Sequence, residues 1–123
     1  MTVELDHLIL RVSDVAKSVR FYHKTLGLKY EPEALVRVSP TLVLQFIEQP
    51  PPVSQHLAFS MTKEEFDAAF ARLKAMQVPY GDNFDTVGAM TGPGISNGSG
   101  KNASSIYFRD PDGHMLEIMH YAS

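Results

Sequence analysis

Three residues of this chain have the chemistry of metal ligands and lie in similar local sequences. His7 in DHLIL, His56 in QHLAF and Glu117 in HMLEIM each occupy the middle of a short apolar run that favours a β-strand. Two imidazoles and one carboxylate form a ligand set that suits a divalent iron, manganese, nickel or zinc ion, with further coordination positions open to water or substrate. Taken singly, each is more simply interpreted as an ordinary strand side chain. Their arrangement along the chain is what indicates a metal site.

The two histidines belong to an internal sequence repeat. When the chain is shifted by the spacing from His7 to His56, the segment DHLILRVSDVAKSVRFYHKTLGLKY overlies QHLAFSMTKEEFDAAFARLKAMQVPY. The other matched pairs are Leu8 with Leu57, Val12 with Met61, Ser13 with Thr62 and Phe21 with Phe70. In both copies a strand led by a histidine runs into a hydroxyl residue suited to capping a helix. Two copies of one unit imply a pseudo-twofold axis with the histidines facing each other across it, as a shared metal site requires.

Composition and charge restrict the class of protein. At 123 residues and a hydrophobic fraction of 44%, the chain is predicted to be one globular domain, residues 1–123, that can bury a core. Its net charge of -3 comes without a basic stripe, so we expect neither nucleic acid nor an anionic membrane surface as a partner. The chain has no Cys, no basic leader and no apolar run of membrane-spanning length. We therefore expect a soluble, cytoplasmic protein.

Periodicity and turn residues predict two units, 1–49 and 54–123, joined by a proline-rich link. The first unit is expected to contain one helix, at 14–26 and capped by Ser13, and strands at 5–12, 28–30, 35–38 and 41–47. The second is expected to contain one helix, begun by a capping box of Thr62 and Glu65 and stopped by Pro79, and strands at 56–61, 105–108 and 115–121. The predicted fold class is α+β, with tandem β-α-β-β-β units.

A long stretch, 81–105, is rich in Gly, Asn and Ser. Within it, 88–105 has a composition that buries too little apolar surface for the segment to order itself firmly. It is interpreted either as a connector or as a lid that closes over the metal when substrate binds.

The repeat, the segment FYHKTLGLKY and the closing run YFRDPDGHMLEIM together resemble the vicinal oxygen chelate superfamily. This group includes glyoxalase I, fosfomycin-resistance thiol transferases, bleomycin-resistance proteins and extradiol dioxygenases. The resemblance implies a cupped, barrel-like mixed sheet with the helices outside and one metal inside. It places the ligands on the first strand of each unit and near the end of the last strand, where His7, His56 and Glu117 stand. It also implies a homodimer whose units pair across chains.

Further site residues follow from symmetry and from the same resemblance. Gln45 is the counterpart of the carboxylate in the first unit, and it could ligate the metal, hold a water or bind substrate. Tyr107 matches a substrate-binding tyrosine of the superfamily and could donate a hydrogen bond to an oxyanion, or simply pack under the second helix. Arg11 matches a position where glyoxalase I holds a substrate carboxylate. His114 and His120, at odd offsets from the carboxylate, are predicted on the opposite strand face, at the surface.

These residues favour metal-assisted catalysis on a small-molecule substrate chelated through two adjacent oxygens. An extradiol-dioxygenase-like reaction is preferred, and a glyoxalase I-like lyase is the alternative, although Gln45 lacks the free carboxylate that a base requires. Thiol transfer is disfavoured because Ile9 stands where the fosfomycin enzymes have a hydroxyl residue. The alternative of another class is a metal-free drug-binding protein of the bleomycin-resistance type, which usually lacks the three ligands.

Overall fold

The computed structural model describes residues 3–32, 34–50 and 53–121 of the chain. By its internal contacts the chain divides into two compact units, Met1–Val53 and Ser54–Ser123. The prolines Pro51 and Pro52 of the predicted link lie outside the described residues. The described residues form one four-stranded and one five-stranded mixed sheet, each with a single helix, and the α+β fold class is confirmed. None of the helices in this part of the chain is long and apolar enough to cross a membrane.

The first unit is a four-stranded sheet with one helix packed on it. Its elements are β1 (His7–Val12), α1 (Val15–Leu26), β2 (Lys29–Glu31), β3 (Leu35–Arg37) and β4 (Val43–Glu48). The strand order is β1-β4-β3-β2, with β1 parallel to β4 and the remaining pairs antiparallel. A parallel neighbour requires a long crossover, which α1, β2 and β3 supply. β1 is therefore an edge strand of its sheet.

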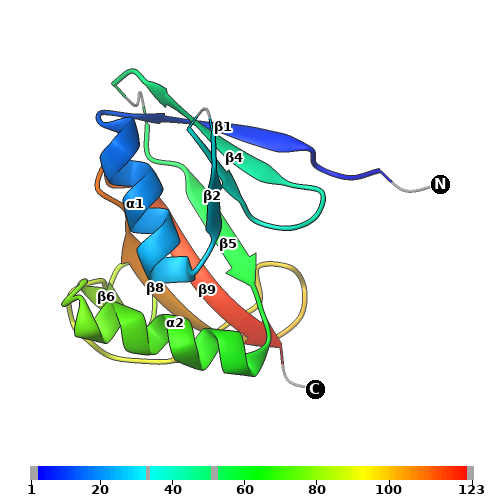
Figure 1. Cartoon of the computed structure of the whole chain (residues 1–123). Coiled ribbons are helices and arrows are strands. Elements are labelled where there is room, and N and C mark those ends of the chain that lie inside the picture. The colour runs from blue at the N-terminus through cyan, green and yellow to red at the C-terminus, as the bar shows by residue number, and fades with distance from the viewer. Residues whose placement is uncertain (1–2, 33, 51–52, 122–123) are drawn as a thin grey trace. The chain divides into compact units, whose positions relative to one another are not determined.

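Local capping sets both ends of α1. Asp14, and not the predicted Ser13, is the N-cap, because its side chain accepts a hydrogen bond from the Lys17 backbone N–H at 3.1 Å. Gly27, directly after the predicted end of the helix at residue 26, ends it in the left-handed conformation. The helix buries Tyr22 and Leu26, and the Tyr22 and Phe46 ring centroids lie 5.2 Å apart. Figure 1 shows α1 beside β2 of the same unit.

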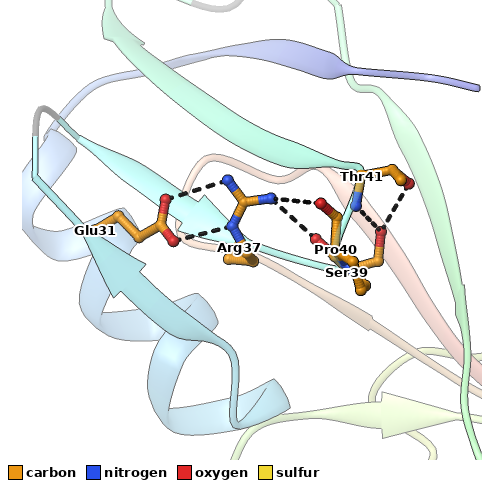
Figure 2. A network of polar contacts seen from close by, with 5 residues as sticks. All are labelled: Glu31, Arg37, Ser39, Pro40 and Thr41. Atoms are coloured by element: carbon orange, nitrogen blue, oxygen red, sulfur yellow. Dashed lines mark hydrogen bonds and ion pairs between the residues drawn. The ribbon is translucent and has the colours of Figure 1, made fainter.

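The β2–β3 hairpin of this unit is tied by an arginine. Figure 2 shows the Arg37 guanidinium between the Glu31 carboxylate and the turn before β4. Its Nε donates to Glu31 Oε2 at 2.9 Å, and one terminal nitrogen donates to the carbonyl oxygens of Ser39 and Pro40 at 3.1 and 3.2 Å. The Arg37 hydrogen bond also lowers the pKa of Glu31. One side chain thus links two strands and the turn that leads to the third.

The second unit repeats the design with additional strands. Its elements are β5 (His56–Ser60), α2 (Lys63–Ala75), β6 (Tyr80–Gly81), β7 (Gly94–Ser96), β8 (Ala103–Arg109) and β9 (Met115–Tyr121). The order is β5-β9-β8-β6, with β7 also pairing with β8, and β5 runs parallel to β9. Like β1, β5 is an edge strand. α2 packs on β9 in this unit (Figure 1).

The predicted capping box of α2 is confirmed. The Thr62 hydroxyl accepts from the Glu65 N–H at 3.1 Å, and the Glu65 carboxylate accepts from the Thr62 N–H at 3.0 Å. The hydrogen bonds that the Thr62 N–H and the Thr62 hydroxyl donate to the Glu65 carboxylate lower the pKa of Glu65. At the other end the helix stops before Pro79, because Gln77 adopts a positive φ of 58°.

The apolar alternation of the strands separates a core face from a site face in each sheet. The sheet positions on the helix-covered face are fully buried and form the cores. They are Leu10, Val12, Val36 and Leu44 in the first unit, and Ile106, Phe108, Leu116 and Ile118 in the second. The alternate positions of β5, β8 and β9 therefore face away from α2, and these positions carry the polar side chains described below.

The segment between β6 and β8 is more ordered than its composition predicts. The Gly88 and Met90 N–H groups both donate to the Tyr80 carbonyl, and β7 pairs with β8. A Cβ at Gly81 would lie 2.2 Å from the Thr86 carbonyl oxygen, and one at Gly94 would lie 2.3 Å from that of Asp82, so the backbone there is closely packed. The expectation that 88–105 does not order itself firmly is wrong for β7 and for the beginning of β8, which pair with each other. The segment 97–102 is the turn that joins them.

Candidate metal-binding site

The site face of the second unit lines an open cavity of about 680 Å³. Its polar lining comes from strands β5, β7, β8 and β9 and from the loops beside them, and its apolar lining includes two well-exposed side chains, Phe84 and Ile95. The side chains that line it are those of Ser54, His56, Asn83, Phe84, Ile95, Ser96, Asn97, Tyr107, Arg109, Met115 and Glu117, together with the Gly98 backbone. Three residues predicted from the sequence, His56, Tyr107 and Glu117, are therefore brought together here.

His56 and Glu117 are placed by the β5–β9 ladder. Ala58 is the register partner of Glu117, and His56 precedes it by two residues on the same strand face. His56 Nε2 lies 3.2 Å from Glu117 Oε1, and the carboxylate is only 5% exposed. Two ligands bound at about 2.1 Å to one ion and separated by 3.2 Å subtend an angle of about 100°, between octahedral and tetrahedral geometry. The donor pair therefore fits a divalent metal.

Tyr107 lies directly beside this pair. It is the antiparallel register partner of Glu117, and its ring stacks on His56 with centroids 6.3 Å apart and planes inclined by 20°. Burial raises the pKa of the Tyr107 phenol, and the negative charge of Glu117 raises it further, while a hydrogen bond with Ser96 acts in the opposite direction. The phenol thus keeps its proton at neutral pH and can act as a hydrogen-bond donor in the cavity.

Two serines complete the polar surroundings of Glu117, and both are absent from the residues predicted as site members. Ser96 Oγ donates to Glu117 Oε2 at 2.8 Å, and Ser105 Oγ lies 2.7 Å from Ser96 Oγ. Ser105 is fully buried. Ser105 could have been found from the sequence, because it shares a strand face with Tyr107 two residues later. Ser96 carries no such signal, because β7 was not predicted.

A buried histidine fixes the start of β5 against the start of β9. His114 is 1% exposed, and its Nδ1 accepts from the Gln55 backbone N–H at 3.0 Å. The Met115 N–H donates to the Gln55 carbonyl at 2.8 Å, and Asp110 Oδ1 accepts from the His114 N–H at 2.8 Å. His114 is on the face opposite Glu117, as predicted, but the prediction that it lies at the surface is wrong. His114 therefore joins the DPDG turn to Gln55, the residue directly before His56.

The other predicted site residues lie in the first unit. His7 is half-exposed on the edge strand β1, and its Nδ1 lies 2.8 Å from Asp6 Oδ2. Arg11 is on the same strand face, and its Nε donates to Gln49 Oε1 at 3.0 Å. Gln45 is half-buried on β4. His7, Arg11 and Gln45 therefore share one face of this sheet, opposite the face that packs on α1.

Register demonstrates that Gln45 and Glu117 are equivalent positions. Ile9 pairs with Gln45 on β1 and β4, and Ala58 pairs with Glu117 on β5 and β9. Ile9 and Ala58 are themselves matched by the sequence repeat. Each unit thus presents a histidine and a carboxamide or carboxylate at corresponding places. Within the described residues, no set of three His, Cys, Asp or Glu side chains gathers as a complete metal-binding group.

Comparisons with known proteins find one matching family and several similar proteins. Residues 4–118 match the family described as the Glyoxalase/Bleomycin resistance protein/Dioxygenase superfamily. Glutathione transferase FosA of Serratia marcescens is 32% identical over 96% of this chain and 81% of its own. Metallothiol transferase FosB of Lysinibacillus sphaericus is 29% identical over 96% of this chain and 83% of its own. Among solved structures, Oxidase ChaP-H1 is 31% identical with a TM-score of 0.78, over 98% of both chains.

Proposed function

Because the chain belongs to the glyoxalase/bleomycin resistance protein/dioxygenase superfamily, we propose that it is a divalent-metal-dependent enzyme acting on a small substrate held through two adjacent oxygen atoms. The observation that carries the proposal is the meeting of His56 Nε2 and Glu117 Oε1, 3.2 Å apart, beside the Tyr107 phenol in an open cavity. An aromatic hydroxyl next to two converging metal donors is an arrangement suited to catalysis, and folding alone does not require it.

The proposed ligands are His7, His56 and Glu117. Asp6 prepares His7 for this role, because a carboxylate only accepts hydrogen bonds and the Nδ1 facing it must carry the proton. In the neutral ring Nε2 then keeps the free lone pair, as in other histidine ligands backed by a carboxylate. When bound, the metal would supply positive charge that stabilises a developing oxyanion and open positions for the substrate.

The chain's own residues orient the substrate and limit water. The Tyr107 hydroxyl is placed to donate a hydrogen bond to a substrate oxygen. Phe84 and Ile95 are 61% and 73% exposed in the cavity lining, where they can cover the apolar body of a substrate. A substrate with two adjacent oxygens at one end and an apolar, flat body at the other is the best match to these surfaces.

For the reaction itself we favour oxidation by O₂ of the extradiol type. In that reaction both atoms of O₂ enter the substrate as a carbon–carbon bond of the ring breaks, and no further reductant is consumed. The similarity to Oxidase ChaP-H1 over nearly the whole of both chains supports this choice. The apolar lining formed by Phe84 and Ile95 supports it as well, because an aromatic diol presents such a face.

Thiol transfer is the second candidate, favoured by the relatives named FosA and FosB, the first a glutathione transferase and the second a metallothiol transferase. In this reaction a thiol sulfur forms a bond to a substrate carbon as a carbon–oxygen bond breaks, and the oxygen takes up a proton. Against it stands Ile9, an apolar side chain on the face of β1 that carries His7. A glyoxalase I-like lyase is less favoured, because Gln45 cannot serve as the base.

A homodimer whose units pair across chains remains our proposal for the assembly. β1 and β5, which carry the two histidines, are both edge strands within their own sheets. Unpaired edges favour association with another strand. In this arrangement His7 would come from one subunit and His56 with Glu117 from the other.

The test begins with metal analysis of protein purified without chelator, which should find about one divalent ion per chain. The His56→Ala variant should lose this bound metal. The metal-loaded protein is then assayed for O₂ consumption with a panel of catechols, and separately for loss of thiol with glutathione and fosfomycin. O₂ uptake that Tyr107→Phe diminishes supports the oxidative proposal. Glutathione consumption without O₂ uptake would replace it with thiol transfer, and a metal-free protein that binds bleomycin would replace it with the drug-binding alternative.

A further inference from the structure

Ser96, in the long β6–β8 segment, is hydrogen-bonded to a proposed metal ligand. Its hydroxyl donates to Glu117 Oε2 at 2.8 Å and lies 2.7 Å from the hydroxyl of Ser105. Glu117 is 5% exposed and Ser105 is fully buried, so water does not easily substitute for either contact. Ser96 itself is half-buried at the end of β7.

The hydrogen bonds in this group have a defined direction. Ser96 has a single hydroxyl proton, and it is used in the bond to the Glu117 carboxylate, which only accepts. The bond between the two serines must then be donated by Ser105 to the Ser96 oxygen. The result is an ordered chain from Ser105 through Ser96 to Glu117, in which each donor strengthens the next.

This chain makes the two oxygens of Glu117 different from each other. Oε2 accepts from Ser96, while Oε1 faces His56 Nε2 at 3.2 Å. Because Oε2 already accepts from Ser96, Oε1 is the oxygen that is more available to a metal. Building on the proposed function, we propose that Ser96 is a positioning residue that holds Glu117 as a single-oxygen ligand and couples the order of the 97–102 turn to metal occupancy.

The coupling follows from where Ser96 lies in the chain. It is the last residue of β7, in register with Ala103 at the start of β8, so the 97–102 turn begins and ends at this pair. When a metal fixes Glu117, the Ser96 contact is fixed with it, and the turn that starts at the next residue has less freedom to open. By reciprocity, a turn that stays closed should strengthen metal binding by the same factor.

The hydroxyl can be removed without removing the strand. β7 is held to β8 by main-chain pairing of Gly94 with Ser105 and of Ser96 with Ala103, which an alanine at position 96 retains. Ser96→Ala therefore deletes one polar contact, and Ser96→Thr keeps a hydroxyl on a β-branched side chain that strands accept. Ser104→Ala is a matched control, because Ser104 is the neighbour of Ser105 on the opposite face of β8.

The experiment titrates Mn²⁺ into the four metal-free proteins by calorimetry, after circular dichroism and thermal unfolding have compared their folds. The dissociation constant should rise about 10- to 100-fold in Ser96→Ala. It should return to within a few-fold of the parent in Ser96→Thr, and it should not change in Ser104→Ala. In a second measurement, Mn²⁺ at one hundred times each protein's own dissociation constant should slow proteolysis within 97–102 in the parent but not in Ser96→Ala.

Each result has one meaning. Equal dissociation constants for the parent and Ser96→Ala would overturn the role of Ser96 and leave the proposed metal enzyme standing. A parent protein that binds no divalent ion would overturn both. If Ser96→Thr bound Mn²⁺ as weakly as Ser96→Ala, the loss would not be due to the hydroxyl, and the positioning role would also be wrong.

Discussion

The metal ligands can be tested through stability before any substrate is known. A ligand that binds only the folded state at one hundred times its dissociation constant stabilises that state by about 2.7 kcal/mol. The entropy of unfolding of a 123-residue chain is about 0.26 kcal/mol per kelvin, at about 2.1 cal/mol/K for each residue. The expected increase in Tm on adding metal to the parent is therefore about 10 °C.

Glu117→Gln should nearly eliminate this increase. The amide keeps an oxygen that can accept from Ser96, so the metal-free fold should be retained, but it replaces a charged ligand by a weak neutral one. If the affinity falls at least hundredfold, the same metal concentration only half-saturates the variant. The remaining stabilisation is then about 0.4 kcal/mol, or an increase in Tm of about 2 °C.

Thermal unfolding at fixed protein concentration, followed by circular dichroism with and without Mn²⁺, measures both shifts. Glu64→Gln is the matched control, because this carboxylate is exposed in the first turn of α2, and it should show the full increase of the parent. A Glu117→Gln protein that gains as much Tm as the parent would refute Glu117 as a ligand. An equal loss in Glu64→Gln would show that net charge, and not ligation, controls the shift.

Three further predictions follow from individual contacts. His114→Ala should lower the free energy of unfolding by about 2–4 kcal/mol in urea titrations, because it creates a cavity and leaves the Gln55 N–H unsatisfied; a loss below 0.5 kcal/mol would contradict this. The pKa of Glu65 is lowered on folding, so its ionised carboxylate contributes to the free energy of unfolding above the ordinary pKa of 4.5, and this contribution is lost as the pH falls through the folded pKa. The parent should therefore lose more stability on acidification than Thr62→Ala. Parallel profiles of stability against pH for the two proteins would contradict this. Tyr107→Phe should reduce turnover about 10- to 100-fold while the Mn²⁺ dissociation constant stays the same, and a weakened metal site would instead assign the phenol a structural role.

Local signals in the sequence were sufficient for both helices and for the strands other than β6 and β7. The residues of β9, Met115–Tyr121, and the capping box of Thr62 with Glu65 agree with the predicted positions. Both depend on contacts within a few residues, which the sequence displays directly. Asp14 displaced Ser13 as the cap of α1, since two adjacent residues can each accept from the first turn and the sequence does not choose between them.

Non-local contacts account for what the sequence did not predict. Periodicity places His114 on the face away from Glu117, but its burial depends on the distant Gln55 N–H, which only the β5–β9 pairing brings near. Ser96 lies in a segment whose Gly-rich composition hides a short strand, because that strand is specified by its partner β8 and not by its own propensity. The joining of His7 to the site depends on how the units pair, and it stays a prediction.

The close packing of the β6–β8 segment divides it into a base that resists substitution and a tip that tolerates it. Any side chain at Gly81 or Gly94 would overlap a carbonyl oxygen, so mutation there is penalised whatever the substrate. At Gly98 a Cβ would meet nothing within 4 Å. Side-chain variation can therefore accumulate at Gly98 while Ser96 stays anchored, but not at Gly100, whose φ of 89° disfavours any other residue. A directed-evolution library confined to Asn97 and Gly98, which line the cavity, would sample new substrates while the glycines that the backbone requires are kept.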